Sequence, residues 1–140
     1  MTHAERLPFI LFLMHLTEKC AAVPKHACAL AYDEVDCDRG DWDQPLEIPV
    51  TDLYDLDSGD GGKNGIESVS VRKGCTLTMI DNDSSPWKDS GRMDFSAPAG
   101  RDLHVNINGN ANKKIDALSD DVEQVICRCP GESKPTFIQL

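Results

Sequence analysis

Basic residues are scarce in this chain of 140 residues. It has 14 Lys and Arg against 24 Asp and Glu, which gives a formal net charge of −10. A protein that binds nucleic acid or an anionic membrane surface needs basic side chains to neutralise phosphates. The sequence therefore predicts no nucleic-acid partner and no membrane partner. Its acidic surface is compatible with the binding of cations.

The sequence also lacks an apolar run that could cross a bilayer. The longest run, Leu7–Leu16, is too short for a transmembrane helix. It follows a polar segment with Arg6 and precedes Cys20-Ala21-Ala22, whose small side chains suit cleavage after Ala22. These features predict a signal peptide over residues 1–22 and a secreted, extracellular domain over residues 23–140. The alternative is an N-terminal helix or strand buried in the fold.

Recognisable catalytic motifs are missing as well. Residues 23–140 contain His26 and His104 as their only histidines, and neither lies in a nucleophile motif. A carboxylate pair for glycoside hydrolysis stays open as an alternative, but an abundance of acids does not supply the required geometry. The sequence predicts that the protein is not an enzyme.

Removal of residues 1–22 would leave an odd number of cysteines. In an exported chain of this size they predict a disulfide framework, in which one cysteine is free or links two chains into a homodimer. A zinc site is disfavoured because Cys127-x-Cys129 lacks the spacing of a zinc knuckle. The disulfide candidates are Cys28, Cys37, Cys75, Cys127 and Cys129.

No segment after residue 22 has helical periodicity. Short runs of alternating apolar residues are separated by Gly, Pro, Asn and Asp, which is typical of an all-β sandwich or barrel. The segment 104–114 is expected to form a strand and a polar turn. The clearest strand candidates are 27–32, 45–50, 66–71, 75–80, 103–107 and 122–127.

The sequence contains a weak internal repeat. Ile66-Glu67-Ser68-Val69 matches Val122-Glu123-Gln124-Val125. Upstream of each copy, a strand candidate runs into an acidic corner, "LAYDEVD" in the first half and "TMIDNDS" in the second. This order of strand, acidic corner, polar loop and strand predicts two Greek keys.

The acidic segment "DLYDLDSGDGGKNGIESVSV" is a poor EF-hand. A loop that starts at Asp55 has Gly59 at position 5, and Ile66 at position 12 where a bidentate Glu is needed. The flanking residues are not amphipathic helices, so this interpretation is rejected.

The segment "KNGIESVSVRKGCTLTMIDND" resembles the junction between the two Greek keys of a βγ-crystallin domain. The resemblance implies an all-β fold in which two Greek-key motifs form a single sandwich domain. The keys would span about residues 27–71 and 75–129, followed by a tail over 130–140. The corner of the first key would contain Tyr32 and Gly40, and that of the second Trp87 and Gly91. Cys37 and Ile80 stand where the family pattern has aromatic residues.

The same resemblance implies calcium sites, one in each key. The family pattern (N/D)(N/D)xx(S/T)S falls on residues 63–68 and 119–124, with Glu67 and Glu123 replacing a hydroxyl residue. Carboxylates are good Ca²⁺ ligands, whereas Lys63 would repel the ion. The second site is expected to be the stronger one. The alternative is that both loops are degraded sites that persist as acidic turns. The implied ligand positions are Asp33, Glu34, Asn64, Ile66, Glu67, Asp81, Asn82, Asp120, Val122 and Glu123.

Two functions follow as expectations. The first is a secreted calcium-binding protein with a structural or stabilising role outside the cell. The alternative is a disulfide-stapled Greek-key toxin or antimicrobial protein that acts on other cells without metal. Asn82 also begins an N-glycosylation sequon.

Overall fold

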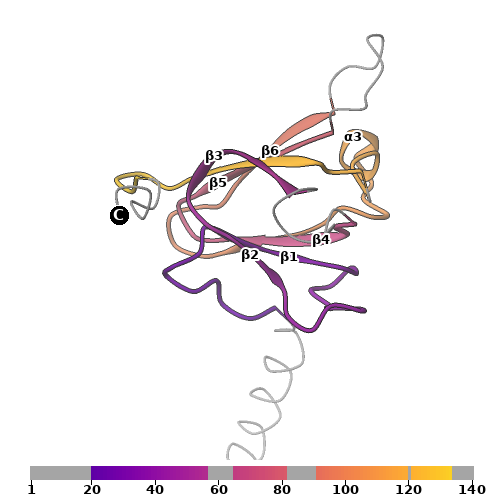
Figure 1. Ribbon diagram of the computed structural model, residues 1–140, viewed down its shortest axis with the longest axis horizontal. Coiled ribbons are helices and arrows are strands. Elements are labelled where there is room, and N and C mark those ends of the chain that lie inside the picture. The colour runs from indigo at the N-terminus through magenta and orange to yellow at the C-terminus, as the bar shows by residue number, and fades with distance from the viewer. Residues whose placement is uncertain (1–19, 57–64, 82–90, 120, 134–140) are drawn as a thin grey trace, which may run out of the picture.

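The computed structural model describes residues 20–56, 65–81, 91–119 and 121–133. Within these ranges the regular secondary structure is almost entirely β, with one helical turn (Figure 1). The elements are β1 (Ala29–Tyr32), β2 (Leu46–Ile48), β3 (Thr51–Asp55), β4 (Ser68–Val71), β5 (Thr76–Ile80), β6 (Arg92–Ser96), β7 (Leu103–Asn106), α3 (Lys113–Asp116) and β8 (Gln124–Arg128).

The strands form two four-stranded antiparallel sheets with the orders β2-β1-β4-β7 and β3-β8-β5-β6. The first four strands make one Greek key and the last four make the other. The third strand of each key, β3 or β7, lies at the edge of the sheet that the other key builds. This exchange joins the keys into one sandwich, which confirms the predicted fold class.

The internal repeat reappears as repeated backbone geometry. Tyr32 pairs with Ser68 between β1 and β4, and Ile80 pairs with Gln124 between β5 and β8. The amide of Glu67 donates to the carbonyl of Tyr32 at 3.0 Å, and the amide of Glu123 donates to that of Ile80 at 2.9 Å. Each acidic corner is thereby joined in the same way to the start of the last strand of its own key.

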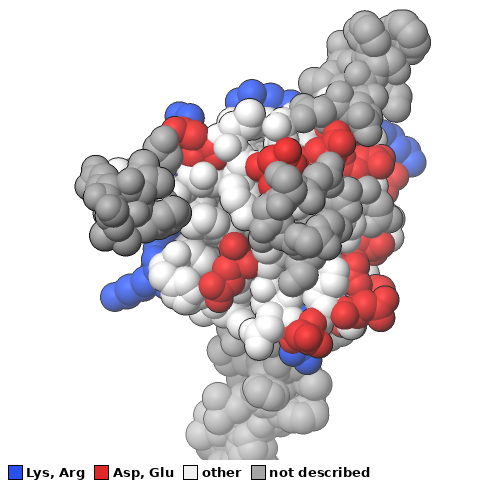
Figure 2. Space-filling model, in the orientation of Figure 1, with Lys and Arg blue, Asp and Glu red and all other residues white. Residues whose placement is uncertain are grey.

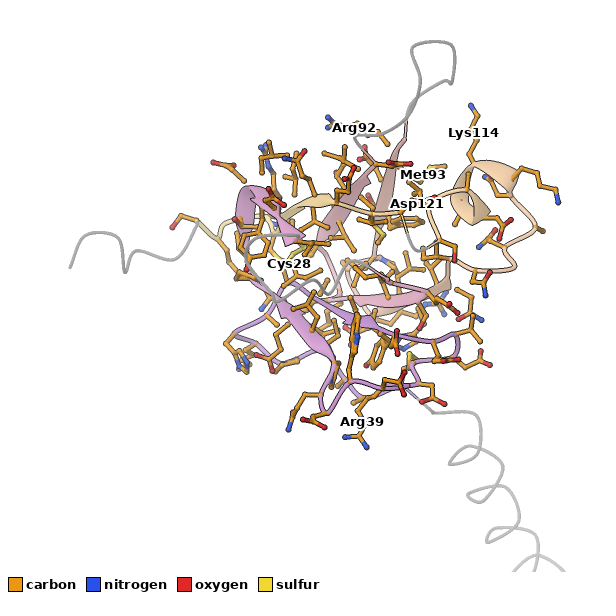
Figure 3. All side chains as sticks on the ribbon, turned by 45° about the vertical axis from the view of Figure 1, so that its right-hand side comes forward. Cys28, Arg39, Arg92, Met93, Lys114 and Asp121 are labelled. Carbon is orange, nitrogen blue, oxygen red and sulfur yellow. A yellow bond between two sulfur atoms is a disulfide. The ribbon has the colours of Figure 1, made fainter. Side chains whose placement is uncertain are left out.

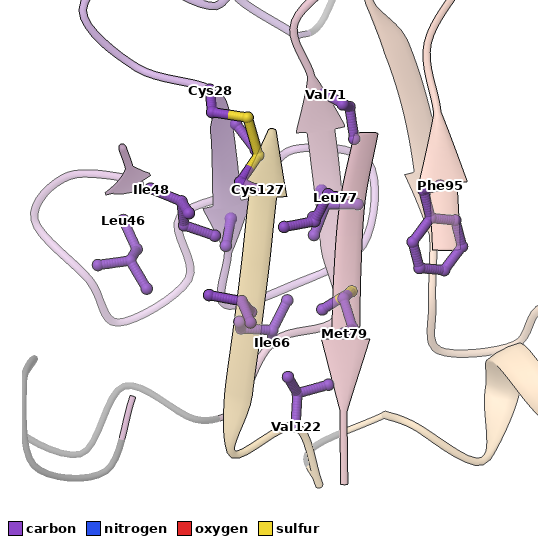
Figure 4. Close-up of a cluster of buried hydrophobic side chains, with 14 of the residues drawn as sticks. Cys28, Leu46, Ile48, Ile66, Val71, Leu77, Met79, Phe95, Val122 and Cys127 are labelled. Atoms are coloured by element: carbon purple, nitrogen blue, oxygen red, sulfur yellow. A yellow bond between two sulfur atoms is a disulfide. The ribbon is translucent and has the colours of Figure 1, made fainter. Parts of the chain in front are cut away.

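The main core lies between the two sheets. Inward-facing residues of both sheets are buried there, together with apolar residues of the loops (Figure 4). Apolar side chains in such a core are the main stabilising term of a fold this size. Its largest fully buried side chains include Ile48, Leu56, Ile66, Leu77, Met79, Ile107, Leu118 and Val122.

A second, smaller core covers the outer face of the first sheet. Val23, Ala27, Leu30 and Tyr32 form it, and Cys37 packs against it. The N-terminal segment and the loop after β1 therefore cover this face. Their presence explains why every residue of β1 and β4 is buried, although each strand has only one side toward the main core.

Some strand predictions were incomplete. The run 45–50 ends as a strand at Ile48, and after Pro49 the chain passes to β3 in the other sheet. Proline has no amide hydrogen for a ladder bond and suits such a break. The edge strand β6 was missed, because only Phe95 of its five residues is buried. The helical turn α3 was also missed; Asn112 caps it by accepting a bond from the amide of Lys114.

All six cysteines are described and paired: Cys20–Cys37, Cys28–Cys127 and Cys75–Cys129. The expectation of an odd cysteine assumed that Cys20 is removed, and the structure pairs Cys20 instead. Cleavage after Ala22 would break this pair, whereas cleavage before Cys20 would keep it. The predicted signal segment itself lies outside the described residues up to residue 19.

Candidate cation-binding corners

The first acidic corner follows β1 and is shaped by a glycine. Gly40 has a φ of +56°, and a Cβ atom at this position would lie 2.4 Å from the Asp33 carboxylate. In the second key, a Cβ atom at Gly91 would lie 2.5 Å from the main-chain oxygen of Asp81. Both glycines that the family resemblance placed in the corners therefore pack directly against the first acidic residue after a strand.

Hydrogen bonds hold the first corner against β4. Besides the bond between Glu67 and Tyr32, the hydroxyl of Ser68 donates to the carbonyl of Glu34 at 2.6 Å. The same hydroxyl accepts the amide of Cys37 at 3.1 Å. Ser68 is buried, so these bonds form away from competing water. They bring Glu34 close to Glu67, and both are among the calcium ligands that the family resemblance implies.

The first corner concentrates negative charge. The carboxylate of Glu67 raises the pKa of Glu34 above its ordinary value of 4.5; partial desolvation and the carboxylates of Asp33, Asp38 and Asp41 raise it further. Figure 2 shows acidic side chains spread over this face of the molecule. A cation placed among these carboxylates would relieve their repulsion.

The only basic side chain of the corner loop points outward. Arg39 donates to the main-chain oxygen of Asp43 at 2.6 Å, and Figure 3 shows it at the outer edge of the loop. Among the described residues, no ion pair joins it to a corner carboxylate, and it does not cancel the effect of Glu67 on Glu34.

Sequence reasoning missed three residues of this corner. Asp38 and Asp41 add to its charge, and the side-chain amide of Asn108 donates to a Glu67 carboxylate oxygen at 3.1 Å. Asn108 reaches Glu67 because β7 pairs with β4. The segment 104–114 contains the predicted strand and turn. Its alternating Asn residues were the one sign in the sequence of the contact between Asn108 and Glu67.

The second corner is described only in part. Asp81 follows β5 and Glu123 precedes β8, so both lie at the same end of this antiparallel pair, and the bond from the Glu123 amide to the Ile80 carbonyl holds them together. The side chains of Ile66 and Val122 are fully buried in the core, so these residues have only main-chain oxygens to offer a metal. Asn64, Asn82, Trp87 and Asp120 lie outside the described residues.

The donor chemistry of the first corner suits a hard cation. Ca²⁺ takes six to eight oxygen ligands, which carboxylates, amides, carbonyls and water can supply. Within the described residues, the groups of three Cys, His, Asp or Glu ligand atoms within 4.8 Å of one another contain no carboxylate. The acidic side chains of the corner are therefore spread apart, and a bound Ca²⁺ would have to draw them together.

The fold and corners define a class of protein: a two-Greek-key sandwich whose third strands are exchanged and whose corners are acidic. The chain is similar in fold to a solved structure described as bearing on the evolution of the eye lens βγ-crystallin domain fold. The TM-score is 0.55, with 14% identity over 79% of this chain and 93% of that one. The chain has the βγ-crystallin fold, as its sequence resemblance predicted.

Two further solved structures give weaker matches. A βγ-crystallin domain from Flavobacterium johnsoniae has a TM-score of 0.48 and 12% identity over 76% of this chain and 99% of its own. Spherulin 3a from Physarum polycephalum has a TM-score of 0.48 and 14% identity over 81% of this chain and 95% of its own. No family model and no curated protein matches the sequence. In the described part of the chain, no helix is long and apolar enough to cross a membrane.

Proposed function

We propose that this protein is a secreted, disulfide-stapled βγ-crystallin-like domain that binds Ca²⁺, with a structural or stabilising role outside the cell. The first corner is the site developed in this proposal, with the carboxylates of Asp33, Glu34 and Glu67 as ligands, because much of the second corner lies outside the described residues. The second corner, around Asp81 and Glu123, is the equivalent site of the other key.

The observation that carries the calcium proposal is that the carboxylates of Glu34 and Glu67 lie close enough to repel each other. Two hydrogen bonds join the corner to the start of β4: the Glu67 amide donates to the Tyr32 carbonyl, and the Ser68 hydroxyl donates to the Glu34 carbonyl. These bonds keep the two carboxylates close together, so their repulsion persists. A bound divalent cation turns this unfavourable contact into a favourable one. An ion that binds only the folded state stabilises it by about 2.7 kcal/mol when its concentration is a hundred times Kd.

Export is supported by the cysteines. Three disulfides in a chain of this size suit an oxidising compartment, since cytosolic thiols are usually kept reduced. An extracellular location also provides the millimolar calcium that weak sites in extracellular modules use.

Thermal unfolding of the full oxidised chain tests the calcium proposal. We expect excess Ca²⁺ to raise the melting temperature relative to EDTA, and MgCl₂ at equal ionic strength to raise it much less. Glu34→Gln and Glu67→Gln should each remove most of the rise in melting temperature that Ca²⁺ produces by binding at the first corner. Isothermal titration calorimetry of the same proteins reports the stoichiometry.

Glu47→Gln is the matched control. Glu47 is exposed on β2 and contacts His26 at 2.9 Å, outside the corner. Its replacement should leave the calcium response intact. Coincident melting curves of the wild-type protein in Ca²⁺ and in EDTA would refute calcium binding, and an equal loss of response in Glu47→Gln would refute this location of the site.

A further inference from the structure

The three disulfides differ in their exposure to solvent. Cys28, Cys75, Cys127 and Cys129 are all at most 5% exposed. Cys20 and Cys37 are only partly buried. Their bond joins the two segments that cover the outer face of the first sheet, so it closes the small core around Leu30 and Tyr32. A reagent in solution can therefore approach this disulfide without unfolding the main core.

A histidine lies beside the exposed disulfide. A ring nitrogen of His104 and the sulfur atoms of Cys20 and Cys37 all lie within 4.8 Å of one another. Ser70 lies between them: its hydroxyl is 2.7 Å from Nδ1 of His104 and 3.5 Å from Sγ of Cys37. The hydrogen bond with Ser70, which is fully buried, fixes the position of the exposed imidazole beside the disulfide. A nearby imidazole favours a thiolate, and thiols with a lower pKa leave a disulfide faster.

The backbone at Cys37 is strained. Asp36 and Cys37 have φ values of 59° and 61°, in the left-handed region that residues other than glycine rarely adopt. Bonds from both amides hold this conformation: that of Asp36 donates to the side chain of Asn106 at 2.8 Å, and that of Cys37 to Ser68 at 3.1 Å.

A groove provides room for a small reagent. It has a volume of about 630 Å³, and its lining includes Ala21, Tyr32 and Cys37. This volume is within the range of small-molecule sites. We propose that Cys20–Cys37 is a site of thiol–disulfide exchange, with soluble low-molecular-weight thiols as the co-substrate and His104 as the group that assists the leaving sulfur. The exchange does not require calcium, although Glu34 of the first corner also lines this groove.

The exchange is chemically balanced. The thiolate of an incoming thiol attacks one sulfur of the Cys20–Cys37 bond; a mixed disulfide forms and the other sulfur leaves as a thiolate that accepts a hydrogen bond or a proton from His104. A second thiol then attacks the mixed disulfide and releases the oxidised small-molecule disulfide. The chain ends with two thiols, and two small thiols have been oxidised to one disulfide.

The test is a timed reaction of the full oxidised chain with reduced glutathione, quenched with iodoacetamide. Fragment mass spectra then locate the alkylated or glutathionylated cysteines. We expect Cys20 and Cys37 to react first, while the four buried cysteines stay paired. Earlier or simultaneous reaction of the buried cysteines would overturn the proposal.

Two matched variants test the role of His104. We expect His104→Gln to slow the exchange severalfold, because the leaving sulfur loses a group that stabilises its thiolate. His26→Gln, which changes an exposed histidine outside this cluster, should react at the wild-type rate. Equal rates in the wild type and His104→Gln would remove His104 from the mechanism.

The N-terminus of the exported protein provides a second decisive measurement. Intact mass of the oxidised protein should correspond to a chain that retains Cys20 and contains no free thiol. A mature chain that begins at Val23 would lack Cys20 and overturn the proposal.

Discussion

The two corner glycines show how single residues shape the acidic corners. Gly40 combines a left-handed backbone with contact to Asp33, whereas Gly91 has its nearest neighbours at Asp81. Any side chain at either position would push the acidic residue away. The corner geometry therefore depends on the absence of a Cβ atom.

We expect Gly40→Ala and Gly91→Ala each to lower the free energy of unfolding by about 1–3 kcal/mol, through backbone strain in the first and steric overlap in both. Gly100→Ala is the control: no atom lies within 4 Å of the added Cβ, and surface changes usually stay within about 0.5 kcal/mol. Urea unfolding of the three variants measures the difference. Equal stabilities would show that the corners adapt without cost.

The raised pKa of Glu34 predicts a pH effect. The folded state holds this proton more tightly than the unfolded state, so the free energy of unfolding falls as pH rises through the folded-state pKa, which lies above 4.5. In EDTA, the wild type should therefore lose stability relative to Glu34→Gln as pH rises through this range. The effect should be small because the carboxyl group is exposed.

Melting temperatures of both proteins between about pH 4 and pH 7 test this difference. Excess Ca²⁺ should reverse the trend, because the ion binds the deprotonated carboxylates. Parallel pH profiles of the two proteins in EDTA would contradict the proposed repulsion.

At the scale of elements, burial differs sharply between central and edge strands. Leu77 on the central strand β5 is fully buried between the sheets, whereas Leu53 on the edge strand β3 is 57% exposed. Their side chains are identical, so the two positions separate the effect of burial from that of residue type.

Leu77→Ala should lower the free energy of unfolding by about 2–5 kcal/mol, because it removes buried methyl groups and leaves a cavity. Leu53→Ala should change it by no more than about 0.5 kcal/mol. Guanidinium unfolding followed by tryptophan fluorescence is a suitable measurement. A similar cost for both variants would contradict the assigned core.

At the scale of the whole molecule, two buried disulfides connect the sandwich. Cys28–Cys127 joins the segment before β1 to β8 in the other sheet, and Cys75–Cys129 joins the residue before β5 to the residue after β8. The sulfurs of Cys28 and Cys129 are only 3.5 Å apart, although they belong to different disulfides. Arg72 donates to the Cys129 sulfur at 3.0 Å.

Cys75→Ser should therefore cause disulfide exchange. Arg72 favours the thiolate of the released Cys129, which can attack Cys28 and release Cys127. We expect a mixture of Cys28–Cys127 and Cys28–Cys129 in non-reducing peptide mass spectra, and a loss of about 2–4 kcal/mol in the free energy of unfolding. Cys37→Ser is the control, because Cys37 pairs with Cys20 and with none of the four buried cysteines. It should leave both buried disulfides unchanged. A single pairing in Cys75→Ser would contradict the prediction.

Local patterns were sufficient to predict much of the first corner. Asp33, Glu34 and Glu67 were expected there because the family resemblance implies calcium ligands in the acidic corners and in the loop before the last strand of each key. Asn108 was not identified, because it is 41 residues from Glu67 in sequence and meets it only through the β4–β7 pair. The partner of Cys37 was missed because the predicted cleavage after Ala22 removed Cys20 from consideration.

The sequence by itself determined the all-β class, the two Greek keys and the acidic corners, because strand alternation, turn residues and repeats are local properties. Only the tertiary structure decided which cysteines pair and which carboxylates meet. Those contacts join residues separated by 34 positions for Ser68 and Glu34, and by 99 for Cys28 and Cys127. They depend on the exchange of β3 and β7 between sheets and on the corner loop covering the first sheet, which no short pattern encodes.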